Sequence, residues 1–308
     1  MIRKKYLYVV IILVIALISG CSAHQIISDS KTKENDITTP ANEVTKAAIV
    51  NEAVIETDYS DFFNAVEGTA VIYNSKESRY YIYNPELAKK QSSPCSSFKI
   101  ISCLMGLESS VIKPESSILK WNGTIYSVSD WNKDINYIEA FRTSCIWYFR
   151  QVIELLGTKY VQNTLDQLEY GNCDISEWEG SLHNLIFPEQ QDLKELNGFW
   201  QESSLQISPI EQVNVLRRIF EEKDVFSQNS LEQIKSVMLT DNSASDIKIY
   251  GKTGSGIKDD TWNDGWFVGM FEVGDEAYYF AFRLNQPGKR GNDAKAIALN
   301  IINEEFGK

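Results

Sequence analysis

Strand-like segments lie near both ends of this chain, and they bracket a long middle with helical patterns. Residues 68–73 and 80–83 are rich in β-branched and aromatic side chains and are joined by the polar segment 74–78. A similar pair, 265–271 and 277–282, lies near the C-terminus. Each pair predicts a β-hairpin. Any fold of this chain must therefore accommodate strands that are far apart in sequence.

Between the two hairpins, apolar residues recur at helical spacing, and the chain ends on a similar pattern. The predicted helices span residues 97–107, 144–156, 159–168, 209–222 and 293–306. Strands from both ends with helices between them predict an α/β (α+β) fold. We expect one antiparallel sheet flanked by helices and an inserted all-helical lobe, with a site at the seam between them.

The N-terminus has the features of an export signal. Basic residues 3–5 precede a short apolar run, residues 6–18, and the small residues Ser19 and Gly20 precede Cys21. This ending resembles a bacterial lipobox, in which the cysteine is lipidated and becomes the new N-terminus. An uncleaved anchor helix is the alternative. Either interpretation predicts an exported protein, and the first predicts a lipid anchor at Cys21 on the outer face of the cytoplasmic membrane.

The sequence after Cys21 is polar and lacks aromatic residues as far as about Ile55. Such a composition is typical of a flexible tether. The predicted organisation is a lipoprotein signal peptide at residues 1–21, a tether at 22–57 and a folded domain at 58–308.

Charge and residue usage exclude several classes of function. Lys and Arg number 30 against 42 Asp and Glu, which gives a net charge of −12 and argues against a nucleic-acid partner. The only histidines are His24, in the predicted tether, and His183, so Ser-His-Asp and Cys-His catalysis would depend on His183 alone. His-rich metal sites are excluded as well, and the five cysteines form no C-x-x-C pair. The chemistry must therefore use Ser, Lys, Tyr or carboxylates, and we predict no metal.

Ser96 and Lys99 form an S-x-x-K motif that places a hydroxyl and an amine one helical turn apart. The pattern alone is weak, because S-x-x-K also begins at Ser28, Ser30, Ser110, Ser117, Ser245 and Ser255. Context favours Ser96. Pro94 ends an extended segment before it, and the apolar residues 100–105 after Lys99 predict a buried helix whose N-terminus stabilises developing negative charge.

A second motif, Lys252-Thr253-Gly254, follows the strand-like residues 247–250. Lys-Thr-Gly on a strand is part of the signature of serine β-lactamases and penicillin-binding proteins. The glycines allow a substrate backbone to approach closely. A solvated surface lysine is the alternative interpretation of Lys252.

From about Tyr59 to Lys308 the chain resembles class D β-lactamases, the oxacillinase type. The resemblance rests on the order of its motifs, any one of which is weak. In chain order they are residues 94–100, 120–123, 131–134, 144–146, 170–172, 199–200 running into 205–213, 252–254 and 265–269. The family fold, a helical lobe against a helix-flanked antiparallel sheet, agrees with the pattern analysis.

The resemblance implies a role for each matching residue. Ser96 would be the nucleophile that opens the β-lactam ring. Lys99 would react with carbon dioxide to form a carbamate, the general base for acylation and deacylation, held by the indole N–H of Trp200. Ser144 would relay protons to the leaving nitrogen, and Lys252 would place positive charge beside the substrate carboxylate.

The resemblance also implies substrate contacts from Ile146, where the family usually has Val, and from Thr253, Gly254 and Ser255. The backbone amides of Ser96 and Ser255 would form the oxyanion hole. The family often has an arginine that binds the substrate carboxylate, but our alignment puts Ala294 there. Thr253, Arg290 or another group would have to take this role.

Three functions are compatible with these residues. Hydrolysis of β-lactams is the leading hypothesis, and a D-alanyl-D-alanine peptidase uses the same Ser-Lys pair. A sensor that is acylated and stays acylated is the third. Trp200 favours a base that persists after acylation and therefore hydrolysis. We expect Cys95, Cys145 and Cys173 to be buried thiols rather than disulfides.

Overall fold

The computed structural model describes residues 53–181, 188–190, 193–222, 224–240, 246–258 and 261–307. The predicted signal peptide with Cys21, the tether up to residue 52 and His183 lie outside the described residues. What the sequence predicts for these residues therefore stays a prediction.

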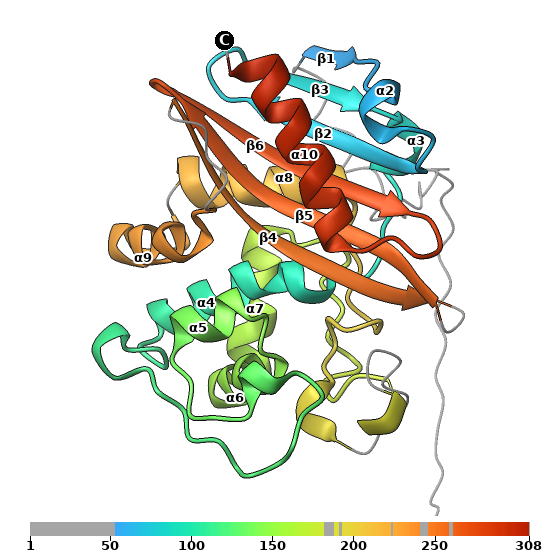
Figure 1. Cartoon of the computed structure of the whole chain (residues 1–308). Helices are drawn as coiled ribbons and strands as arrows, with labels where there is room; N and C mark the ends of the chain where they lie inside the picture. Colours follow the sequence, from blue (N-terminus) through green and yellow to red (C-terminus); the bar gives the residue numbers. More distant parts are fainter. Residues whose placement is uncertain are drawn as a thin grey trace, which may run out of the picture. The chain divides into compact units, whose positions relative to one another are not determined.

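Both predicted hairpins are confirmed, and they meet in the middle of one six-stranded sheet of order β1-β3-β2-β6-β5-β4 (Figure 1). The first hairpin is β2 (Gly68–Asn74) with β3 (Arg79–Tyr83), and the second is β5 (Thr261–Val273) with β6 (Glu276–Asn285). Strand β2 pairs antiparallel with β6, so the two ends of the domain are joined through backbone hydrogen bonds. Strand β4 (Ile247–Lys258), which carries Lys-Thr-Gly, forms one edge of the sheet.

The opposite edge of the sheet differs from the prediction. Strand β1 (Ala53–Glu56) lies within the residues expected to form the tether, and it pairs with β3 in parallel. The sheet is therefore mixed rather than wholly antiparallel. The physical reason is local, because the β-branched Val54 and Ile55 favour an extended backbone and β3 offers unpaired backbone groups on that side.

One helix covers the first face of the sheet. This is α10 (Gly291–Phe306), close to the predicted C-terminal helix (Figure 1). Its residues Ala294, Ala298 and Ile302 pack with the strand residues Phe267 and Phe280 in a buried apolar core.

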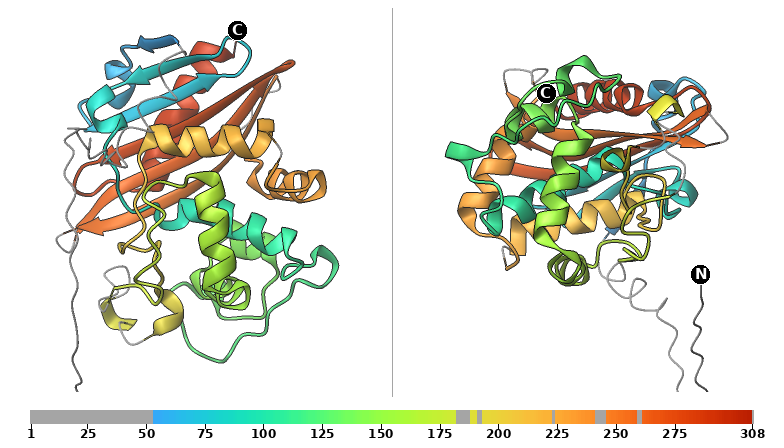
Figure 2. Two further views of the ribbon diagram at one scale, coloured as in Figure 1. Left: turned by 180° about the vertical axis from the view of Figure 1, so that it is seen from behind. Right: turned by 90° about the horizontal axis from the view of Figure 1, so that it is seen from below.

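Helix α8 (Pro209–Arg217) packs on the other face, and the remaining main helices form a lobe beyond it (Figure 2). Their bounds are α4 (Lys99–Glu108), α5 (Tyr137–Arg142), α6 (Ile146–Leu156), α7 (Thr158–Leu168) and α9 (Gln228–Met238), with the short helices α2 (Ser60–Phe63) and α3 (Pro85–Ala88) near β2 and β3. Single turns lie at η1 (Cys95–Phe98), η2 (Pro114–Ser116), η3 (Ser129–Trp131), η4 (Pro188–Gln190), η5 (Lys194–Leu196) and η6 (Arg218–Glu222). The inserted helical lobe is thus confirmed.

The start of helix α8 follows sequence signals. Ser208 and Glu211 form a reciprocal capping box at the start of α8, and Pro209 occupies its first turn. No helix in the described ranges is both long and apolar enough to cross a membrane.

Candidate active site

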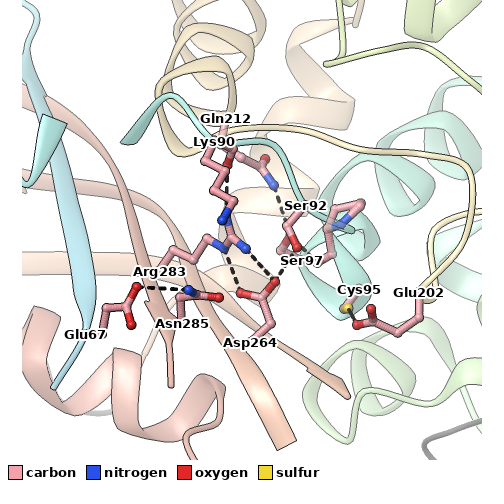
Figure 3. Close-up of polar contacts among 11 residues, drawn as sticks. Glu67, Lys90, Ser92, Cys95, Ser97, Glu202, Gln212, Asp264, Arg283 and Asn285 are labelled. Carbon is pink, nitrogen blue, oxygen red and sulfur yellow. Dashed lines mark hydrogen bonds and ion pairs between the residues drawn. The ribbon is translucent and has the colours of Figure 1, made fainter. Parts of the chain in front are cut away.

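Ser96 lies in a tight turn, η1, that leads directly into α4. Cys95, immediately before it, has a left-handed backbone with φ of 49°. The Ser97 hydroxyl donates to the Pro94 carbonyl at 2.7 Å and accepts from the Gln212 side-chain amide of α8 at 3.1 Å (Figure 3). These contacts anchor the turn and so determine where the Ser96 hydroxyl lies.

Lys99 lies one turn further along and contacts Ser96. Its Nζ donates to Ser96 Oγ over 2.9 Å, and its side chain is 0% exposed. Burial lowers the pKa of Lys99 from its ordinary 10.5 to about 8, because the charged amine loses hydration. A lysine with this pKa is partly neutral near physiological pH, so it can accept a proton from Ser96.

Ser144 and Lys252 form a second contact beside the first. Ser144 precedes α6 with a left-handed backbone, φ 59°. Lys252 Nζ donates to Ser144 Oγ over 3.1 Å and to the Thr253 carbonyl over 2.9 Å. Burial lowers the pKa of Lys252 well below its ordinary value, and the nearby cations Lys99 and Lys295 lower it further. The surface-lysine interpretation of Lys252 is wrong, since this residue is only 5% exposed.

Strand β4 lies against the nucleophile turn at Gly254. A Cβ atom at this position would lie 2.9 Å from the Pro94 carbonyl and 3.1 Å from the Ser97 nitrogen, so only glycine allows this approach. The next residue, Ser255, accepts a hydrogen bond at its Oγ from the Gly291 amide, 3.0 Å away. The close packing brings Ser255 and Ser96, the two residues expected to supply oxyanion-hole amides, to the same seam.

Trp200 has a buried donor without an acceptor. The side chain is 1% exposed, and its ring stacks on Phe98, the neighbour of Lys99, at 5.8 Å and 26°. Within the described part of the chain, no group accepts a hydrogen bond from its indole Nε1. Leaving a buried donor unpaired costs free energy. An additional acceptor placed beside the indole N–H would therefore stabilise the site. A carbamate, which has only acceptor oxygens when ionised, fits this donor.

A pocket of about 310 Å³ opens beside Lys252 and Thr253. It is also lined by Arg142 at the end of α5 and Lys295 on α10, and its described lining residues include no Asp or Glu. Neither Arg142 nor Lys295 lies in a recognised motif, although Lys295 directly follows Ala294. Ala294 itself is completely buried against the sheet and cannot bind a substrate.

The remaining predicted residues are placed as follows. Ile146 is buried in the first turn of α6, two residues after Ser144. Cys95, Cys103 and Cys145 are buried free thiols, and Cys173 is a partly buried one.

The fold brings a serine and a buried lysine into hydrogen-bond contact, an arrangement that suits an activated serine nucleophile. The sequence matches the family model described as the penicillin binding protein transpeptidase domain over residues 62–303. This chain therefore belongs to the penicillin-binding transpeptidase family.

Its relatives include both enzymes and regulators. The chain is 28% identical over 299 residues to the probable β-lactamase YbxI of Bacillus subtilis. This alignment covers 97% of each sequence. It is 32% identical over 247 residues to the regulatory protein BlaR1 of Staphylococcus aureus, covering 80% of this chain but only 39% of BlaR1. A class D β-lactamase structure from Bacillus subtilis superposes with a TM-score of 0.69 at 28% identity, covering 82% of this chain and 96% of that one. The protein has a β-lactamase fold, and the chain spans about two fifths of the length of the regulatory proteins that it matches.

Proposed function

We propose that this protein hydrolyses β-lactam antibiotics through an acyl-enzyme on Ser96, with Lys99 as the source of the general base, and so confers resistance. The observation that carries the proposal is the completely buried Lys99 amine, 2.9 Å from Ser96 Oγ and with its pKa lowered to about 8. In that state the base can be neutral when a substrate arrives.

In acylation, the base at Lys99 takes the proton of the Ser96 hydroxyl, and Ser96 Oγ attacks the β-lactam carbonyl carbon. The amide C–N bond of the ring then breaks. Ser144, polarised by its contact with Lys252, relays to the leaving ring nitrogen the proton that the base took from Ser96, so that Ser144 regains the proton it gives. The Lys252 amine, which donates a hydrogen bond to Ser144 Oγ, stabilises the negative charge that develops in this step.

Deacylation needs a base that still works after Ser96 is esterified. A carbamate on Lys99 would supply such a base, and it can form only from the neutral amine that burial favours. The Trp200 indole N–H, which has no acceptor among the described residues, would hold it. This pairing supports hydrolysis over a stable acyl-enzyme.

Substrate carboxylate recognition falls to the pocket beside Lys252. Thr253 and Lys295 line it, whereas Arg290 stacks on the ring of Trp262 at 4.3 Å. Because β-lactams carry a carboxylate next to the ring nitrogen, the cationic lining favours their binding. We propose that Lys295 supplies the charge that Ala294 lacks.

The similarity to BlaR1 supports a second candidate, a β-lactam-binding domain that is acylated and stays acylated. A D-alanyl-D-alanine peptidase is the third, since it uses the same serine and lysine. Mixing the purified protein with a chromogenic cephalosporin separates them. Many turnovers per molecule would support hydrolysis, one stoichiometric burst would support sensing, and release of D-alanine from a pentapeptide would support the peptidase.

Export and lipid anchoring at Cys21 belong to the same proposal, because β-lactams act outside the cytoplasmic membrane. They rest on the sequence of residues 1–21 alone.

A further inference from the structure

We infer that Glu202 is a positioning residue that holds the nucleophile turn against strand β4 and so maintains the geometry of the acylation site. None of the recognised motifs includes Glu202. The inference rests on the proposed acylation of Ser96, and it assigns Glu202 no direct contact with substrate.

The first contact of Glu202 is with the residue that precedes the nucleophile. The Cys95 thiol donates to Glu202 Oε1 over 3.0 Å (Figure 3). Cys95 is completely buried and left-handed, so it sits in a conformation that costs free energy unless neighbouring contacts hold it. Glu202 provides such a contact, and any shift of Cys95 moves Ser96 with it.

The second contact is with strand β4, just past Ser255. A Cβ atom at Gly256 would lie only 1.9 Å from Glu202 Oε1, so the carboxyl group packs directly on the strand backbone. The backbone amide of Ile257 lies close enough to this carboxyl group to lower its pKa. The pairing of β4 with β5 shifts register between Gly256 and Ile257, a point where the ladder alone does not fix the strand.

The backbone of Glu202 is anchored in turn. Its amide donates to Ser93 Oγ at 2.9 Å, and Ser93 Oγ donates to the Trp200 carbonyl at 2.9 Å. Glu202 is itself left-handed, φ 47°. Three segments therefore meet at one carboxyl group: the nucleophile turn, the segment that carries Trp200, and β4.

The carboxyl group of Glu202 is partly buried and lies near one acidic and one basic side chain, Asp264 and Arg283. The pKa of Glu202 is raised to about 7, mainly by burial. Asp264 of β5 also raises it, whereas the Cys95 contact, the Ile257 amide and Arg283 of β6 lower it. Asp264 is itself paired with Arg283 at 2.7 Å and 2.9 Å. Above about pH 7 Glu202 is ionised and accepts the Cys95 hydrogen bond most strongly. Below about pH 7, protonation of Glu202 weakens this hydrogen bond, so the turn is held less firmly.

The test compares acylation by a fluorescent penicillin in the wild-type protein, Glu202→Ala and Glu202→Gln. Glu115→Gln, an exposed change on η2, is the matched control. We expect Glu202→Ala to slow acylation about tenfold or more, because small misplacements of a nucleophile cost large factors in rate. Glu202→Gln should retain most of the rate, since its amide keeps an acceptor, but should lose the wild-type pH dependence near pH 7.

The pH profile separates positioning from stability. A purely structural role predicts a lower melting temperature in both variants with the profile near pH 7 unchanged, and this result would overturn the inference. Acylation by Glu202→Ala at the wild-type rate would overturn it too. The change in acylation rate that the titration of Lys99 produces near pH 8 should remain in every variant.

A double-mutant cycle with Cys95 tests the contact itself. Cys95→Ser keeps a donor and should acylate nearly as fast as the wild type, whereas Cys95→Ala should be slow. Glu202→Ala should then add little to Cys95→Ala, because each change removes the same interaction. Additive effects would contradict the inference.

If the wild-type protein itself is not acylated at Ser96, the proposed function fails, and the inference fails with it.

Discussion

Lys99 Nζ lies 2.9 Å from Ser96 Oγ, at the end of a side chain that has no exposed surface. An amine in bulk water would be protonated at neutral pH and could not act as a base. Here the loss of hydration favours the neutral amine, and the same burial keeps it in contact with the hydroxyl. This one contact connects the fold to the proposed chemistry.

We predict that benzylpenicillin acylates Ser96 and no other serine. Peptide mapping after brief exposure should place the adduct there, and Ser96→Ala should show none. Ser117→Ala, which also alters an S-x-x-K motif, is the control and should be labelled like the wild type. An adduct on Ser110, Ser117 or Ser245 would contradict the whole assignment.

Turnover should depend on carbon dioxide. In degassed buffer near pH 6 most of Lys99 is protonated, because its pKa is about 8, so the carbamate is lost and activity falls. Activity should recover as the pH rises toward 8 and on addition of bicarbonate. Lys99→Ala should acylate slowly and trap the acyl-enzyme.

Trp200→Phe serves as a companion variant, because it removes the indole N–H and keeps an aromatic ring against Phe98. It should resemble the degassed wild-type protein, with bicarbonate restoring part of the rate. Turnover indifferent to bicarbonate at every pH, with no carbamate signal in carbon-13 spectra, would favour the peptidase.

Replacing Lys99 by Met should stabilise the fold. A pKa lowered from 10.5 to about 8 means that the charged lysine costs about 3 kcal/mol in the folded state below about pH 8. The folded wild-type protein binds fewer protons than the unfolded chain between the two values, so its stability rises with pH across that window. Urea unfolding near pH 6 should show the largest gain for Lys99→Met, and the gain should shrink toward pH 10.

Lys113→Met, at an exposed position, controls for the loss of a lysine charge and should leave stability nearly unchanged. Equal stability of Lys99→Met and wild type near pH 6 would show that Lys99 is not buried as described.

Lys295→Gln should raise KM for penicillins with a free carboxylate, by about tenfold, because it removes a cation from the pocket beside Thr253. The methyl ester of the same penicillin, which lacks that charge, should be affected little. Lys289→Gln, on the preceding turn and outside the lining of this pocket, is the control. Equal effects on acid and ester would mean that Lys295 does not recognise the carboxylate.

Cys21→Ser should abolish labelling of the protein by radioactive palmitate and release it from the membrane fraction. This follows from the cysteine placed directly after a short apolar run. Labelling that persists in the variant would show that Cys21 is not the lipidated residue.

Much of the fold was predictable because local sequence patterns control local structure. Alternation and β-branched residues marked β2, β3, β5 and β6, and helical spacing marked α10. The parallel strand β1 was missed, since four residues within a polar segment carry little signal until β3 is present to pair with them.

The sequence by itself determined which residue types are available for chemistry. With so few histidines and an ordered set of motifs around Ser96, Lys99 and Lys252, it pointed to serine-lysine acyl transfer. These motifs are local, and the order in which they occur is preserved however the chain packs.

Only the tertiary structure decided how those groups behave. Lys252 meets Ser144 across 108 residues of sequence, and Cys95 meets Glu202 across 107. Burial and contact between such distant segments depend on how the sheet packs against the helical lobe. Because burial lowers the lysine pKa values and raises that of Glu202, the packing of the whole domain sets the charge states at the site.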